Sequence, residues 1–99
     1  MKAKLKFTET VVEKRTVKKD SMTYSYALLK HESKKLSSFR IPLYAIRIGL
    51  TDELGTYTEA QTDELFSDLG KAMVFYDRLI RNLATPIDLA YVVEDEILR

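Results

Sequence analysis

The chain has 99 residues, of which 45% are hydrophobic and 31% charged, as expected for one small globular domain. It contains no cysteine, which excludes disulfides, thiolate catalysis and Cys-ligated zinc or iron–sulfur centres and suits a reducing, cytoplasmic setting. No apolar run approaches the roughly 20 residues of a membrane span, and no signal-peptide core follows Met1, so we expect neither.

Charge is distributed unevenly along the chain. Residues 1–50 hold 12 Lys and Arg against 4 Asp and Glu, a net charge of +8, whereas residues 51–99 hold 4 against 11, a net charge of −7. Such asymmetry is typical of a nucleic-acid-binding face, but two layers of one domain that complement each other also produce it.

Alternating apolar and polar residues predict four strands, at about residues 2–12, 22–31, 41–50 and 56–65. The clearest alternation is in IPLYAIRIGL, where Tyr44, Ile46 and Ile48 share one face. The charged segment Glu13–Ser21 is predicted to be a turn region. Segment 56–65 is ambiguous, because Thr58 and Gln61 could instead form a capping box at the start of a helix. We favour the strand.

Helical spacing replaces the alternation after Ser67, and it predicts helices at about 67–83 and 86–98. Ser67 is the expected N-cap of the first helix, while Thr85 followed by Pro86 marks the start of the second. The predicted buried positions are Leu69, Ala72, Met73, Tyr76, Ile80 and Leu83 in the first helix and Leu89, Ala90, Val93 and Ile97 in the second. The sequence therefore predicts one α+β domain, a four-stranded antiparallel meander sheet with two C-terminal helices packed on one face.

The C-terminal half resembles a known family. YAIRI at 44–48, followed by the helical segments LFSDLGKAM and TPIDLAYVVEDEIL, is similar to domain-of-unknown-function family 6514. Ala45 stands where the family pattern has Gly, and Asp88 where it has His. The resemblance implies the same fold and a cytoplasmic bacterial setting, and it transfers no catalytic residue. The positions that carry it are Tyr44, Ile46, Ser67, Pro86, Leu89, Val92, Val93, Glu94 and Asp95.

The residue types do not favour an enzyme. His31 is the single histidine and lies in the polar segment KHESKK, where we interpret it as a solvated turn residue rather than part of a catalytic triad. The acids Glu94, Asp95 and Glu96 are adjacent on a helix, about 100° apart, and cannot converge on one cation. The three glycines form no phosphate-binding motif. We therefore predict no catalytic, cofactor or metal site.

Nucleic-acid binding is the alternative function. A basic surface on the first strand and the following turn could bind phosphates, and Tyr24, Tyr26 and Tyr44 could stack on bases if exposed. The isoelectric point of about 7.9 is below that of a typical nucleic-acid-binding domain. The candidate contacts are Lys2, Lys4, Lys6, Arg15, Lys18 and Lys19.

A protein-interaction or regulatory module is the function that the sequence favours. Two helices can cover only one face of the sheet, yet both faces of its middle strands are partly apolar, and an uncovered apolar patch marks an interface. We therefore predict a homodimer or a protein partner on the face away from the helices. We also expect Glu94, Asp95 or Glu96 to lie near basic side chains of residues 1–50. The predicted interaction residues are Ala27, Leu29, Leu43, Ala45 and Arg47.

Overall fold

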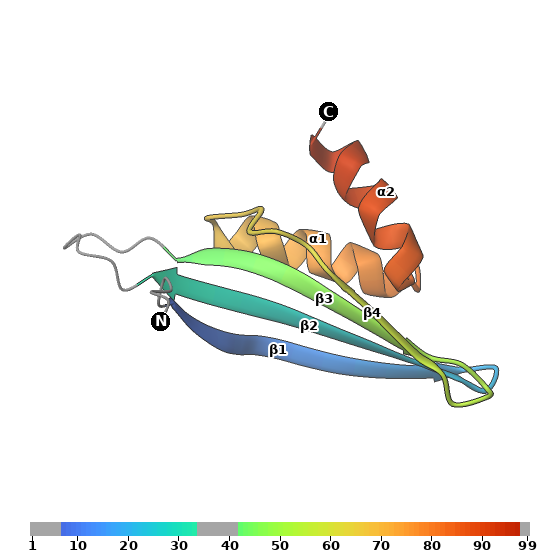
Figure 1. The fold of residues 1–99 in the computed structure, drawn as a ribbon. Coiled ribbons are helices and arrows are strands. Elements are labelled where there is room, and N and C mark those ends of the chain that lie inside the picture. The colour runs from blue at the N-terminus through green and yellow to red at the C-terminus, as the bar shows by residue number, and fades with distance from the viewer. Residues whose placement is uncertain (1–6, 34–41, 98–99) are drawn as a thin grey trace, which may run out of the picture.

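The computed structural model describes residues 7–33 and 42–97 and confirms the predicted α+β architecture (Figure 1). Four antiparallel strands form one sheet in the order β1-β2-β3-β4, and two helices follow. The elements are β1 (Phe7–Lys19), β2 (Met22–Ser33), β3 (Leu43–Thr51), β4 (Tyr57–Gln61), α1 (Leu69–Arg81) and α2 (Pro86–Ile97).

The first hairpin is longer than predicted. Strand β1 continues to Lys19, through the segment that the sequence analysis assigned to a turn, and the turn itself consists of Asp20 and Ser21. Both residues have positive φ, at 51° and 69°, which matches the twist of a two-residue hairpin turn. The charged residues that suggested a turn lie instead along an edge strand, where lysines discourage pairing with other chains.

A β-bulge at Val12 decides which side chains of β1 face the helices. Val11 pairs with Leu29 and Glu13 pairs with Leu28, so one extra residue lies between the two pairs. Residues before the bulge therefore alternate in the opposite sense from those after it. As a result Glu9 shares the face of Leu29, away from the helices, whereas Glu13 faces them.

The segment after β4 stays beside β3. Strand β4 confirms that the ambiguous segment is extended, although it ends at Gln61. The backbone N–H of Thr62 then donates to Ile46 O at 2.9 Å, and that of Leu65 to Tyr44 O at 3.0 Å. These bonds hold Glu64 next to β3 on the way to α1.

Capping interactions define the helix ends. The N-cap of α1 is Asp68, one residue later than predicted, and its carboxylate accepts the N–H of Lys71 at 3.1 Å. Leu83, with φ 49°, ends α1 in a Schellman motif, in which Ala84 N donates to Leu79 O. Thr85 caps α2 as predicted, in a reciprocal capping box with Asp88.

The main core lies between α1 and the sheet face formed by Tyr26, Leu28, Ile46 and Ile48. The predicted stripe of α1 is partly wrong, because Leu69 is 43% exposed whereas Phe75 and Leu79 are buried. In α2, Leu89 is buried as predicted but Ala90 is exposed. Each helix is rotated from the expected orientation because its neighbours decide which of two adjacent apolar stripes is covered.

Two buried tyrosines connect the layers of this core. Tyr26 Oη donates to Ala84 O at 2.9 Å and Tyr76 Oη donates to Tyr26 O at 3.3 Å, so the sheet, α1 and the link to α2 are hydrogen-bonded together. Burial raises the pKa of each tyrosine to about 12 from the ordinary value of 10.0.

These tyrosines predict an alkaline loss of stability. Between pH 10 and about pH 12 the unfolded chain loses phenolic protons that the folded chain retains, so the free energy of unfolding falls as pH rises. Tyr26→Phe and Tyr76→Phe should each cost about 1 kcal/mol at neutral pH, through the lost hydrogen bond, and make the alkaline decline shallower. Urea unfolding at neutral and alkaline pH measures both effects. An unchanged alkaline slope in both variants would contradict this assignment.

Candidate functional site

A network of charged side chains crosses the sheet face that the helices leave uncovered. His31 Nε2 lies 2.9 Å from Glu9 Oε1, and His31 Nδ1 lies 2.6 Å from Glu64 Oε2. Arg47 Nη2 donates to Glu9 Oε2 at 3.0 Å, and Arg47 Nε donates to Gln61 Oε1 at 2.9 Å. The network therefore joins side chains from all four strands and the segment after β4.

This network borders the small apolar cluster of Ala27, Leu29 and Ala45, which was predicted to form an interface. Arg47 on β3 and Glu9 on β1 flank β2, and they pair across it at the level of Leu29. Leu29 is fully buried and Ala45 is 1% exposed. The prediction placed these side chains correctly on the face away from the helices, but it was wrong to treat them as an exposed apolar patch. Of the five predicted residues, Ala27, Leu29 and Ala45 are buried, and Leu43 and Arg47 are partly exposed.

His31 is not the solvated turn residue that the sequence suggested. It lies in β2, is 7% exposed, and contacts a carboxylate with each ring nitrogen. A carboxylate only accepts hydrogen bonds, so a ring nitrogen that carries a proton donates to the carboxylate that it contacts. A cavity of about 420 Å³ opens beside it, lined also by Gln61, Thr62, Asp63 and Glu64.

Electrostatics in the network favour the charged form of Glu9. The hydrogen bond with His31 is the main reason that the pKa of Glu9 lies below its ordinary value of 4.5, and Arg47 lowers it further, while partial burial opposes both. The network therefore depends on an ionised Glu9, which bridges the imidazole and the guanidinium.

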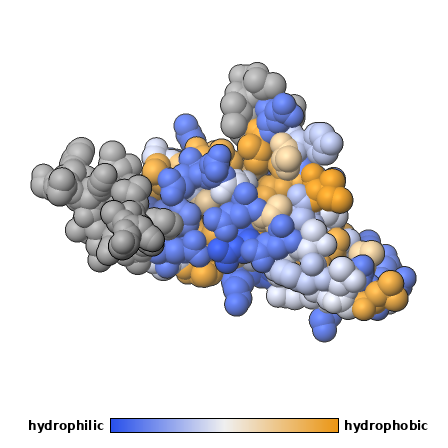
Figure 2. Space-filling view, viewed as in Figure 1, coloured by the Kyte–Doolittle hydropathy of each residue, from blue (hydrophilic) through white to orange (hydrophobic). Residues whose placement is uncertain are grey.

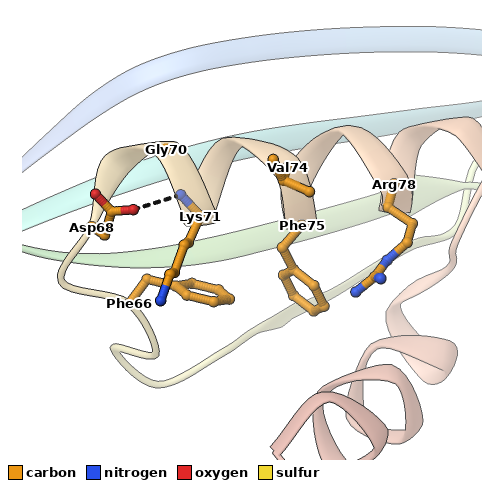
Figure 3. Close-up of a pocket in the computed structure, with 7 residues that line it drawn as sticks. All are labelled: Phe66, Asp68, Gly70, Lys71, Val74, Phe75 and Arg78. Atoms are coloured by element: carbon orange, nitrogen blue, oxygen red, sulfur yellow. Dashed lines mark hydrogen bonds between the residues drawn. The ribbon is translucent and has the colours of Figure 1, made fainter.

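A second feature is a groove between α1 and the segment that precedes it, which we call the α1 groove. It has a volume of about 300 Å³ and a floor made of the rings of Phe66 and Phe75, whose centroids are 5.4 Å apart. Figure 3 shows Lys71, Phe75 and Arg78 extending from the same side of α1, with the ring of Phe66 beside them. The lining residues are Phe66, Asp68, Gly70, Lys71, Val74, Phe75 and Arg78.

The rim of the α1 groove is cationic. Lys71 is exposed, and the Arg78 guanidinium lies over the Phe75 ring, 5.4 Å from its centroid. The one carboxylate in the lining, that of Asp68, is occupied as the N-cap of α1. Val74 is 64% exposed at the edge of the groove, so an apolar side chain faces solvent beside the two cations.

Of the three tyrosines predicted to stack on bases, Tyr24 is partly buried and its ring stacks on that of Tyr26, with centroids 6.5 Å apart. Lys2, Lys4 and Lys6 lie outside the described residues. Lys18 and Lys19 end β1 beside the hairpin turn, and Arg15 is paired with Glu13. Tyr26 is fully buried and Tyr44 is 7% exposed, so neither ring can stack on a base.

The expected pairing of the C-terminal acids is not found for Glu94. Glu94 is exposed and forms no ion pair with the described residues, and the side chains of Asp95 and Glu96 lie outside the description. The two oppositely charged halves meet elsewhere, where Arg47 lies 3.4 Å from Glu59 and His31 contacts Glu64.

Sequence reasoning missed both the charged network and the α1 groove. Glu9 and His31 are brought together by the Val12 bulge, which leaves no periodic signal. The groove could have been found from Lys71, Phe75 and Arg78, whose spacing of four and three residues places them on one helix face.

Comparison with known proteins identifies the family. The model of a family of unknown function, DUF6514, matches residues 5–99. The chain belongs to DUF6514. No curated protein and no solved structure matches this DUF6514 chain. The match extends the resemblance seen in the C-terminal half to nearly the whole sequence, including the strands that carry Glu9 and His31.

Neither a metal-ligand cluster nor a membrane-spanning helix is found in the described part of this DUF6514 chain. Within residues 7–33 and 42–97, no group of three or more His, Asp or Glu side chains could hold a metal ion. No helix in the same part of the chain has the length and apolar character needed to cross a membrane.

The charged network predicts an acid-sensitive component of stability. Because the pKa of Glu9 is lowered in the folded chain, its contribution is present above pH 4.5 and is lost as pH falls through the folded pKa. Glu9→Gln should therefore lower the free energy of unfolding at neutral pH and flatten its decline as the pH falls from neutral to below 4.5. Urea unfolding across this range tests it, with Glu53→Gln, an exposed acid between β3 and β4, as the control. Equal slopes for both variants and the parent would rule out the role of Glu9.

Proposed function

We propose that this protein is a non-catalytic protein-interaction module that acts in the cytoplasm and binds its partner at the α1 groove. The observation that supports the proposal is the combination of an aromatic floor, two cations and an exposed Val74 on one side of a single helix. Protein interfaces are built from such aromatic and Arg anchors at the centre of a patch that excludes water.

The position of His31 supports a structural rather than a catalytic role. Both of its ring nitrogens contact carboxylates, and the side chain is 7% exposed. A general base must reach the proton that it removes from a substrate. An imidazole held between Glu9 and Glu64 instead fastens the segment after β4 to the sheet and so fixes Phe66 at the groove.

The charges of the α1 groove indicate the chemistry of the partner. Lys71 and Arg78 lie about two helical turns apart along the groove, with the two phenylalanine rings between them and below them. A partner segment with apolar side chains next to an acid would fill the floor and pair with Lys71. Such complementarity accelerates encounter and excludes basic competitors.

Site-specific photo-cross-linking in the native cell tests this function. A photoreactive residue at Val74 should give a discrete protein adduct, whereas one at Leu54, which is 86% exposed in the β3–β4 hairpin, should not. Lys71→Glu should reduce the Val74 adduct by about tenfold, because a rim attraction becomes a repulsion.

Lys71→Glu is a suitable test variant because it should not destabilise α1. Position 71 follows the N-cap by three residues, where Glu favours a capping box and the positive helix end. Lys18→Glu in the β1–β2 hairpin makes the same charge change away from the groove and should leave the adduct unchanged. Equal adducts at Val74 and Leu54, or equal effects of the two reversals, would contradict the proposal.

A further inference from the structure

Helix α2 carries a second apolar stripe that the fold leaves uncovered. Its inner side packs into the core through Leu89, which is 2% exposed. On its outer side Ile87 is 72% exposed and Tyr91 is 69% exposed, and Glu94 follows three residues later. Residues spaced by four and three lie along one helix face, so these side chains form a continuous stripe of two apolar groups and an acid.

The N-terminal end of α1 and the C-terminal end of α2 each carry a side-chain charge that the helix dipole disfavours. The first turn of α1 carries Lys71 and no acid after the N-cap Asp68, although the positive helix end disfavours a base there. The last turn of α2 contains no base, although its negative end favours one, and it carries Glu94. An acidic helix end placed against Lys71 would pair two charges that the two helix dipoles disfavour.

The outer stripe of α2 and the α1 groove also match in length and composition. Lys71 to Arg78 and Ile87 to Glu94 both span seven residues, or about 10 Å along a helix. In an antiparallel arrangement Glu94 lies near Lys71, Tyr91 near the phenylalanine floor, and Ile87 near Arg78. Amphipathic helices bind apolar grooves through anchors at this spacing.

We propose that the α1 groove of one chain binds α2 of a second copy, so that two chains form a symmetric homodimer in which each groove holds the partner's helix. This proposal rests on the proposed interaction function and names its partner. The α2 of the same chain cannot take this place, because its Leu89 face is fixed in its own core. Reciprocal exchange uses the same two surfaces on both copies, as a two-fold axis requires. It also gives a reason for the acidic end of α2.

Figures 1 and 2 show why α2 is accessible to a second copy. The helix rises steeply from the sheet, and its far end projects beyond α1. In the space-filling view, hydrophobic surface gathers along α2, whereas hydrophilic side chains cover most of the strands. A helix that projects in this way can enter a partner's groove without rearranging the sheet.

Light scattering on the full-length protein over about 1 μM to 1 mM tests the dimer by its mass. We expect a shift towards twice the mass of the chain as concentration rises. Lys71→Glu alone and Glu94→Lys alone should each weaken dimerisation about tenfold or more, because each turns two attractive contacts into repulsive ones. Neither change harms its helix, since Glu suits the start of α1 and Lys suits the end of α2. Lys18→Glu serves as the control and should dimerise like the parent.

Mixing the two weakened variants gives the decisive result. In a mixed dimer, the acid introduced at position 71 of one chain faces the base introduced at position 94 of the other. The second groove keeps the parent pair of Lys71 and Glu94, so both contacts are attractive and association should return to the parent level. Recovery on mixing supports the proposal. Dimerisation that neither Lys71→Glu nor Glu94→Lys weakens would overturn it. A mixture of the two variants that stays monomeric would also overturn it.

Different results would contradict the proposed dimer and the proposed interaction function. A chain that stays monomeric at every concentration overturns the dimer. If its Val74 cross-link in cells then gives an adduct with a different protein, and Lys71→Glu removes that adduct, the interaction function stands without the dimer. A monomer with no such adduct overturns both.

Discussion

A sheet with two faces and only two helices must cover its second face by other means, and this constraint shapes the whole molecule. Helix α1 covers the face of Tyr26 and Ile46. On the other face, Arg47 and Glu9 pair across β2 above Leu29, and His31 joins Glu9 to Glu64. Long charged side chains can shield apolar atoms with their stems while their heads stay near water.

Exposed apolar side chains remain on the sheet, at Val11 and Tyr57, and on the outer sides of both helices. Among the large hydrophobic side chains that the structure leaves exposed, Val74 lies on α1 and Ile87 and Tyr91 lie on α2. The same network reaches the groove indirectly, because His31 holds Glu64 and the chain then runs through Phe66 into α1. The charged network and the groove are thus linked through one short segment.

The sequence was sufficient for the architecture because its strongest patterns are local. Alternation in β3 and the Thr85–Pro86 helix start depend on neighbouring residues, and both are found where predicted. Features that depend on pairing between distant segments were not predictable. The Val12 bulge changes the side of the sheet on which Glu9 lies, and which stripe of α1 is buried depends on how the helix meets Tyr26 and Ile46. Composition showed that the far face has apolar residues, but only the register shows the ion pairs that cross them.

The account places the molecule's interface on its helices rather than on the sheet face whose apolar cluster of Ala27, Leu29 and Ala45 is buried. The most direct measurement is a series of amide NMR spectra of the full-length protein at increasing concentration. Our account predicts concentration-dependent shifts at Lys71, Val74 and Tyr91, with the amides of Ala27 and Ala45 unchanged. Shifts confined to Ala27, Ala45 and their neighbours on the sheet would contradict it, because association would then use the face that carries the charged network.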